Sequence, residues 1–199
     1  MPLPDVAPYR TRSPDRIAIA LAFGLGGALA LVVAGWVKFV TPGSAAYSSN
    51  PTWTEVPWPF PMDEWGRGKA YRCTAAGCGA ETVVYLRAKI GFCNCTSGVV
   101  DDEELGRLSD LNLIGVNAGA LDTGKTISVG WMKGRSRLYL IANRGGDAIA
   151  LTAAFHNDCD ALVGTAVFGG ARPADAERTV TRFLNSSTAL DWAKVELGL

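Results

Sequence analysis

Residues 17–37 form a run of 21 uncharged, mostly apolar residues between Arg16 and Lys38. A helix of this length is roughly 31 Å long, close to the thickness of the hydrocarbon core of a membrane. The alternative is a cleaved signal peptide, for which residues 43–45 would be the cleavage site, but its apolar core would be shorter, about 7–15 residues. We therefore predict a retained transmembrane helix at residues 17–40.

The basic residues around this run predict its orientation. Three arginines precede it: Arg10, Arg12 and Arg16. After the run, Lys38 is followed by no basic residue until position 67. Because Lys and Arg are enriched on the cytoplasmic side, we expect residues 1–16 to be a cytoplasmic tail. The span would then lie in the inner membrane, with the rest of the chain in the periplasm.

Small residues recur at every fourth position of the predicted span: Ala18, Ala22, Gly26, Ala30 and Ala34. Small side chains let helix backbones approach closely, and in lipid such packing is a main attraction between helices. The stripe indicates either packing against a membrane-protein partner or an ordinary Ala-rich anchor surrounded by membrane lipid.

Residues 41–66 are predicted to be a linker, because they contain five prolines that favour extended backbone. We call residues 53–65 the strap, since they carry three tryptophans and a phenylalanine: Trp53, Trp58, Phe60 and Trp65. Aromatic rings are costly to expose to water. The strap should therefore lie on the chain's own domain, on the membrane surface or on a partner.

Residues 67–199 are long enough for one domain. Period-two alternation predicts a half-buried strand at 81–90, followed by four strand-like stretches at 126–133, 136–143, 147–155 and 161–168. Gly134-Arg135 is the expected hairpin turn between the first two of these stretches. Helical spacing then predicts helices at 173–184 and 189–197. Because the predicted strands come first along the chain and the helices come last, we expect an α+β fold with a mainly antiparallel sheet.

The strongest chemical signal is the set of five cysteines: Cys73, Cys78, Cys93, Cys95 and Cys159. Exported thiols tend to form disulfides, and a bond within the C-x-C pair would be strained. We expect one cysteine of the first pair to bond with one of the second, which leaves Cys159 as the odd one. The first four are alternatively ligands of a zinc site or redox-active thiols. No haem or iron–sulfur spacing is present, and we expect no cofactor.

Three weaker motifs have plain structural readings. Residues 119–126 match the phosphate-loop pattern, but a strand-like stretch follows, so we interpret them as a turn and expect no bound nucleotide. His156 is the only histidine, and it is either a turn residue or the base of a Cys–His pair with Cys159. The acidic run 101–104 is interpreted as a helix N-terminus rather than a calcium loop.

A basic group on the predicted sheet comprises Arg87, Lys89, Lys133, Arg135 and Arg137. It would either contact anionic lipid head groups or an acidic partner, or be solvated.

Three stretches, residues 58–70, 87–95 and 131–137, resemble a family of uncharacterised single-span, membrane-anchored proteins of alphaproteobacteria. The resemblance covers most of residues 53–199. It implies a periplasmic location for the exported part, and it implies no activity and no catalytic residues.

The chain has 19 basic and 19 acidic residues, which argues against a nucleic-acid-binding protein. We expect a non-enzymatic, membrane-anchored accessory or assembly subunit of a larger membrane complex, such as a respiratory complex. The alternative is a thiol–disulfide or metal-handling protein that uses the first four cysteines. An enzyme of another type is disfavoured, because few recognisable acid–base groupings are present.

Overall fold

The computed structural model describes residues 51–91, 95–143, 146–169 and 173–199. The chain divides into two units, Met1–Thr41 and Pro42–Leu199. Within the described residues, no helix has both the length and the apolar composition that crossing a membrane requires. The predicted tail, the transmembrane helix at 17–40 and its small-residue stripe all lie outside the described residues, so they stay predictions.

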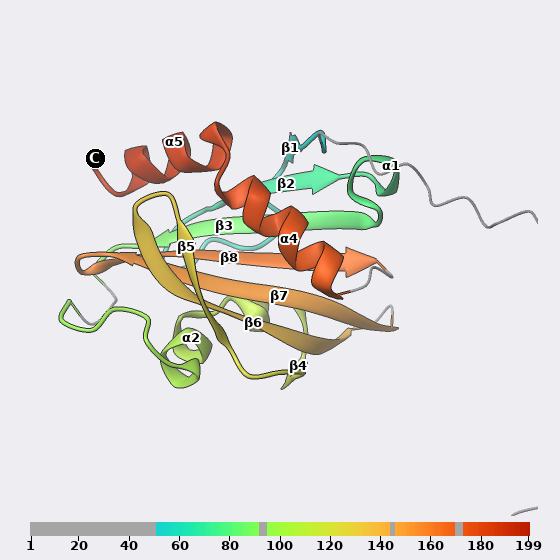
Figure 1. Ribbon diagram of the computed structural model, residues 1–199, viewed down its shortest axis with the longest axis horizontal. Coiled ribbons are helices and arrows are strands. Elements are labelled where there is room, and N and C mark those ends of the chain that lie inside the picture. The colour runs from blue at the N-terminus through green and yellow to red at the C-terminus, as the bar shows by residue number, and fades with distance from the viewer. Residues whose placement is uncertain (1–50, 92–94, 144–145, 170–172) are drawn as a thin grey trace, which may run out of the picture. The chain divides into compact units, whose positions relative to one another are not determined.

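An eight-stranded sheet organises the second unit (Figure 1). The strands are β1 (Thr54–Val56), β2 (Lys69–Cys73), β3 (Glu81–Lys89), β4 (Asn117–Ala120), β5 (Lys125–Val129), β6 (Met132–Asn143), β7 (Gly146–Asn157) and β8 (Asp160–Gly169). Their order is β1-β2-β3-β8-β7-β6-β4, and β5 also pairs with β6. All pairings between these strands are antiparallel. The mainly antiparallel sheet with a few helices is therefore confirmed.

Two C-terminal helices, α4 (Pro173–Leu184) and α5 (Ser187–Glu196), cover one face of the sheet (Figure 1). Both lie close to their predicted positions. The hydroxyl of Ser186 accepts from the backbone N–H of Ala189, which caps α5. The largest apolar core lies between these helices and the sheet and includes Leu86, Leu151, Phe155, Leu162, Val180, Phe183 and Leu184.

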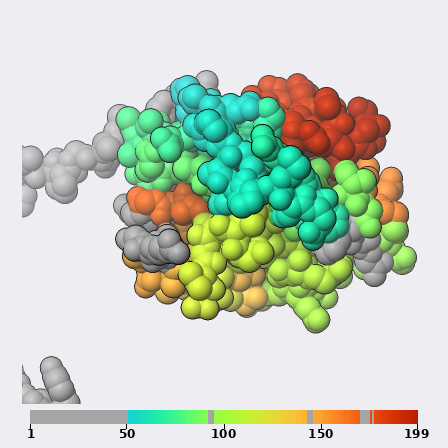
Figure 2. Space-filling view, turned by 180° about the vertical axis from the view of Figure 1, so that it is seen from behind, coloured from blue at the N-terminus to red at the C-terminus, as the bar shows by residue number. Residues whose placement is uncertain are grey.

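The opposite face is covered by the strap and by two short helices, α2 (Asp102–Leu108) and α3 (Leu111–Ile114). In the view from behind, the strap residues, in cyan and turquoise, run across the domain (Figure 2). These segments also cover part of β3. Arg87 and Lys89, which lie on the face of β3 that is turned away from α4 and α5, are only 2% and 4% exposed. The prediction of a half-buried strand holds for the first part of β3, where buried residues alternate with more exposed ones, and is wrong for its end, which is buried on both faces.

The turn between β5 and β6 lies at Gly130 and Trp131 and not, as predicted, at Gly134-Arg135. Gly130 has a φ of +57°, a conformation that favours glycine. Gly134 lies inside β6, where a Cβ atom would come within 2.0 Å of the carbonyl oxygen of Ala154 in β7. Glycine at 134 permits close approach of two strands, which the sequence did not distinguish from a turn.

The strap is part of the folded domain. Its strand β1 pairs with β2, with Glu55 opposite Tyr71. The domain therefore begins before residue 67, and the prediction of a linker over 41–66 does not hold for its second half. Pro51 and Pro57 flank β1 and keep it short, as is typical of an edge strand.

Candidate functional site

The aromatic side chains of the strap lie on the chain's own domain, the first of the three locations that the sequence allowed. Trp53 packs against Phe183 of α4, with ring centroids 4.3 Å apart. On the opposite face of the sheet, Trp58 and Phe60 pack against Tyr85 of β3, with centroid distances of 6.0 and 4.9 Å. The strap therefore contacts both faces of the sheet.

The rings of the strap also cover two cations of β3. The guanidinium carbon of Arg87 lies 6.0 Å from the ring centroid of Trp58, and Lys89 Nζ lies 5.6 Å from that of Trp65. Such cation–π contacts are strongest where water is excluded. Gly68 leaves the space for Trp58, because a Cβ atom there would lie 2.7 Å from the indole ring.

Between the strap and β3 lies an ionic cluster in which Asp63 of the strap joins the buried side chains of Arg87, Lys89 and Asp110. Arg87 donates from Nε to Asp110 Oδ2 at 3.0 Å and from Nη1 to Asp63 Oδ2 at 2.6 Å. Lys89 Nζ lies 3.0 Å from Asp110 Oδ1. The side chains of Arg87, Lys89 and Asp110 are at most 6% exposed, whereas Asp63 is 32% exposed. Two positive and two negative charges therefore balance under the strap.

The ion-pair partners in this cluster favour the charged forms of Asp63 and Arg87. Burial raises the pKa of Asp63, but hydrogen bonds from Arg87 and from the backbone N–H of Trp65 lower it more, so its pKa lies below the ordinary value. Burial lowers the pKa of Arg87, but its bonds to Asp110 and Asp63 raise it above the ordinary value. Both side chains are thus held as ion-pair partners rather than prepared for proton transfer.

A polar cavity of about 300 Å³ adjoins the cluster. Besides the four charged residues, it is lined by Glu64, Trp65, Gly106, Arg107, Ser109 and Asn112. Most sites for organic ligands are largely apolar, whereas this cavity is bordered by the charges of the ionic cluster, which already pair with one another. The cavity could admit a small polar group that competes with Asp63 for Arg87.

A second ionic cluster accounts for most of the remaining predicted basic group. Arg135 Nε donates to Asp102 Oδ1, and Arg137 Nη1 lies 3.4 Å from Asp102 Oδ2. Asp101 accepts from the backbone N–H of Glu104 at 2.8 Å and caps α2. The acidic run is therefore a helix N-terminus, as predicted, and Asp102 fastens that terminus to β6.

We expect Asp102→Asn to flatten the acid side of the stability profile. Hydrogen bonds from Arg135 and from the backbone N–H of Gly124 hold the pKa of Asp102 below its ordinary value. Such a carboxylate contributes stability above its unfolded-state pKa of about 3.9 and loses it as the pH falls through the lower, folded-state value. Urea unfolding at a series of pH values should show that the wild type loses more stability than the variant below about pH 5. Parallel profiles would contradict this role.

The phosphate-loop match lies in an edge of the sheet. Residues 119–126 include the end of β4, a four-residue connection and the start of β5, so the interpretation as a turn before a strand is confirmed. Gly124 is needed for contact with α2, because its Cβ atom would lie 2.0 Å from Asp102 Oδ1. Lys125 Nζ donates to Glu177 Oε2 of α4 at 2.9 Å. Both motif residues thus have structural partners.

Lys125→Ala should change the free energy of unfolding by less than about 1 kcal/mol, because the Lys125 side chain is more than half exposed and solvent screens its ion pair with Glu177. Titration calorimetry should detect no ATP binding by either the wild type or the variant. ATP binding by the wild type that disappears in the variant would contradict this interpretation.

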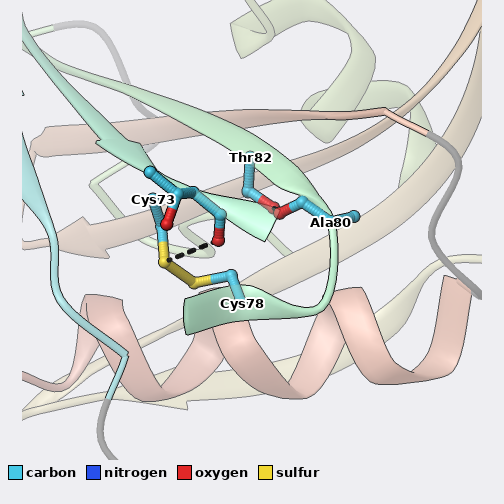
Figure 3. Close-up of a disulfide and its surroundings, with 5 residues drawn as sticks. Cys73, Cys78, Ala80 and Thr82 are labelled. Atoms are coloured by element: carbon cyan, nitrogen blue, oxygen red, sulfur yellow. Dashed lines mark hydrogen bonds between the residues drawn. A yellow bond between two sulfur atoms is a disulfide. The ribbon is translucent and has the colours of Figure 1, made fainter. Parts of the chain in front are cut away.

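Two disulfides join four of the cysteines. Cys73 bonds with Cys78 across α1 (Ala75–Cys78), next to the hydrogen bond from the Thr82 hydroxyl to the Ala80 carbonyl (Figure 3). Cys95 bonds with Cys159 in the turn between β7 and β8. The predicted pairing across β3, with Cys159 left over, was wrong. The single turn of α1 returns Cys78 to within 5.9 Å of Cys73, measured between Cα atoms.

The sequence also allowed a zinc site formed by the first four cysteines. One of them, Cys93, lies outside the described residues. The other three members, Cys73, Cys78 and Cys95, are bonded to other cysteines and are not thiolate ligands. Across the described ranges, no group of three or more His, Cys, Asp or Glu side chains is arranged to hold a metal ion.

His156 lies in strand β7 and not in the predicted turn. Its Nδ1 atom accepts from the backbone N–H of Val99 at 3.3 Å, and its ring packs against Gly98, where a Cβ atom would lie 2.4 Å away. The histidine therefore supports the segment that precedes α2. The proposed Cys–His pair was wrong, because Cys159 is in a disulfide.

The chain matches no model of a known protein family, and no curated protein matches it significantly.

Proposed function

We propose that this chain is a membrane-anchored periplasmic accessory or assembly subunit of a larger membrane complex, such as a respiratory complex, with no catalytic activity of its own. The observation that carries this proposal is the pairing of four cysteines in two disulfides. Disulfides persist in oxidising compartments and are rare in the cytosol. They therefore support export of the domain beyond the apolar run, as its flanking arginines predict.

The two ionic clusters support a structural rather than a catalytic role. In the first, Arg87 and Lys89 are neutralised by Asp110 and Asp63, and in the second, Asp102 holds α2 on the sheet. Perturbed pKa values also mark catalytic groups, but here they follow from ion pairs that fasten the strap and α2. A domain fastened in this way suits a subunit that positions partners.

The alternative of a thiol–disulfide or metal-handling protein has less support. It needs reduced thiols, and among the described cysteines all four are oxidised. Alkylation before and after reduction, followed by mass spectrometry, separates the two functions. Permanently bonded cysteines at 73, 78, 95 and 159 support the subunit, whereas thiols that exchange with a redox buffer or bind zinc support the alternative.

Purification of the tagged full chain from its native membranes in mild detergent tests the proposed function. We expect a defined set of membrane proteins to copurify in fixed stoichiometry and to dissociate together when the complex is disrupted. A variant that lacks residues 1–50 is the control and should recover far less of the set. Recovery of the intact chain alone, or of a partner bound only through a mixed disulfide, would contradict the proposal.

The predicted topology can be measured with reporter fusions. Alkaline phosphatase, which is active only after export, should be active when it is fused after residue 45, and a cytoplasmic reporter should be active at the N-terminus. An active cytoplasmic reporter after residue 45 would contradict the topology and the compartment that the disulfides imply.

A further inference from the structure

Among the residues that the structure describes, nothing pairs with the outer side of β4, at one edge of the sheet. This strand pairs with β6 on one side, and all four of its residues, Asn117–Ala120, are exposed. The strand has the sequence Asn-Ala-Gly-Ala, without a charge, a proline or a large side chain. An edge strand of this kind presents backbone N–H and C=O groups to which a further strand can pair.

The other outer strands carry the protection that β4 lacks. On the far edge, β1 is three residues long, is flanked by prolines, and carries the Glu55–Lys69 ion pair at 2.5 Å. Beside β4, the strand β5 begins with Lys125, which pairs with Glu177. Short length, proline and charge are the usual devices against edge-to-edge pairing. β4 is nearly as short as β1, but it is the one outer strand among the described residues that carries no charged side chain, and this singles out the segment.

Exposed apolar side chains surround the open edge. Val116 and Leu121, which precede and follow β4, are 81% and 49% exposed. Leu140 of β6, directly opposite Gly119 in the sheet, is 41% exposed. A strand added at this edge would shield these side chains while it satisfied the backbone groups of β4.

We propose that β4 pairs with β4 of a second copy of this chain, which extends the antiparallel sheet across a two-fold axis. Antiparallel pairing of identical strands is compatible with two-fold symmetry. Residues 115–121 are uncharged, so self-pairing places no like charges opposite one another, a juxtaposition that would be unfavourable. The chain as a whole has no net charge that would repel a second copy. The pairing is inferred from β4 itself, and the concentration at which it forms rests on the membrane anchoring of the proposed function.

The paired strands would form a small interface. A strand of four residues is about 13 Å long, and stable complexes generally cover about 800 Å² per partner. The dimer should therefore be weak in dilute solution and should form where copies are concentrated, as they would be in a membrane. The dimer should therefore be tested in membranes that contain the full chain.

Cross-linking at the two edges tests the proposal. In a Cys93→Ser background, we introduce Ala120→Cys at the open edge or Thr54→Cys at the β1 edge and add the short reagent bismaleimidoethane. We expect covalent dimers at position 120 and few at position 54. Equal yields at both positions would mean random encounters and would overturn the proposal.

Substitutions at Gly119 test the contact without disturbing the monomer, because a Cβ atom there has nothing within 4 Å. Gly119→Lys should lower the cross-link yield at position 120 by about fivefold, since it places like charges near each other. Gly119→Val should raise the yield, because valine favours strands. Gly106→Lys in α2 is the matched control, with equally open space around its Cβ atom. A yield that does not respond to Gly119→Lys, or that falls as much with Gly106→Lys, would overturn the proposal.

Discussion

Replacement of Cys95 and Cys159 together by serine should lower the free energy of unfolding by about 4 kcal/mol. The two cysteines are 64 residues apart in the sequence. In the chain-entropy model, a disulfide restricts the unfolded chain more as the closed loop lengthens, and a loop of this length corresponds to about 4 kcal/mol. Net stabilities of domains are about 5–15 kcal/mol, so this bond supplies a large share.

The Cys73–Cys78 bond is the matched comparison within the same domain. It joins cysteines only five positions apart, for which the same model gives about 2 kcal/mol. Thermal and urea unfolding of the two double serine variants should therefore give the larger loss for the Cys95/Cys159 pair, and the difference in melting temperature should be several degrees. Equal losses, or a larger loss for Cys73/Cys78, would contradict the loop-length argument.

The elements that the sequence predicted correctly are those with long, regular patterns. Strands β3, β7 and β8 and helices α4 and α5 are each at least nine residues long, which is long enough for an apolar run or a helical period to stand out in the sequence. The elements that it missed, such as α1, α3 and β4, are four residues long, so no period can be read from them. Cysteine pairing was mispredicted for this reason, because it depends on the single turn of α1.

The second covered face of the sheet could not be read from the sequence. Arg87 and Lys89 alternate with apolar residues of β3 and therefore resemble a solvated face. Their counter-charges, Asp110 and Asp63, are 23 and 24 residues from Arg87 in the chain. Each carboxylate lies in a segment without a regular pattern. The one available signal was the aromatic strap, whose rings had to lie against some surface and do lie over these cations.

The ionic cluster under the strap leads to the second large effect. Asp110→Ala should lower the free energy of unfolding by about 3–5 kcal/mol, because it leaves Arg87 and Lys89 buried without their shared partner. Asp63→Ala is the control at the rim of the same cluster. Because Asp63 is partly exposed, water can replace it, and we expect a loss of about 1 kcal/mol.

A triple variant separates the cost of an unpaired charge from the contribution of the contacts. When Arg87→Met and Lys89→Met accompany Asp110→Leu, the buried charges disappear together and apolar side chains fill their space. Replacing a whole buried ion pair in this way is often close to neutral, so the triple variant should be more stable than Asp110→Ala alone. The stabilities of all three variants can be compared by the midpoints of their urea unfolding curves, provided that the dependence of the free energy on urea concentration is unchanged. If instead the triple variant is the least stable, the hydrogen bonds within the cluster stabilise the fold themselves. The charged side chains of β3 would then contribute more than the balance of buried charge.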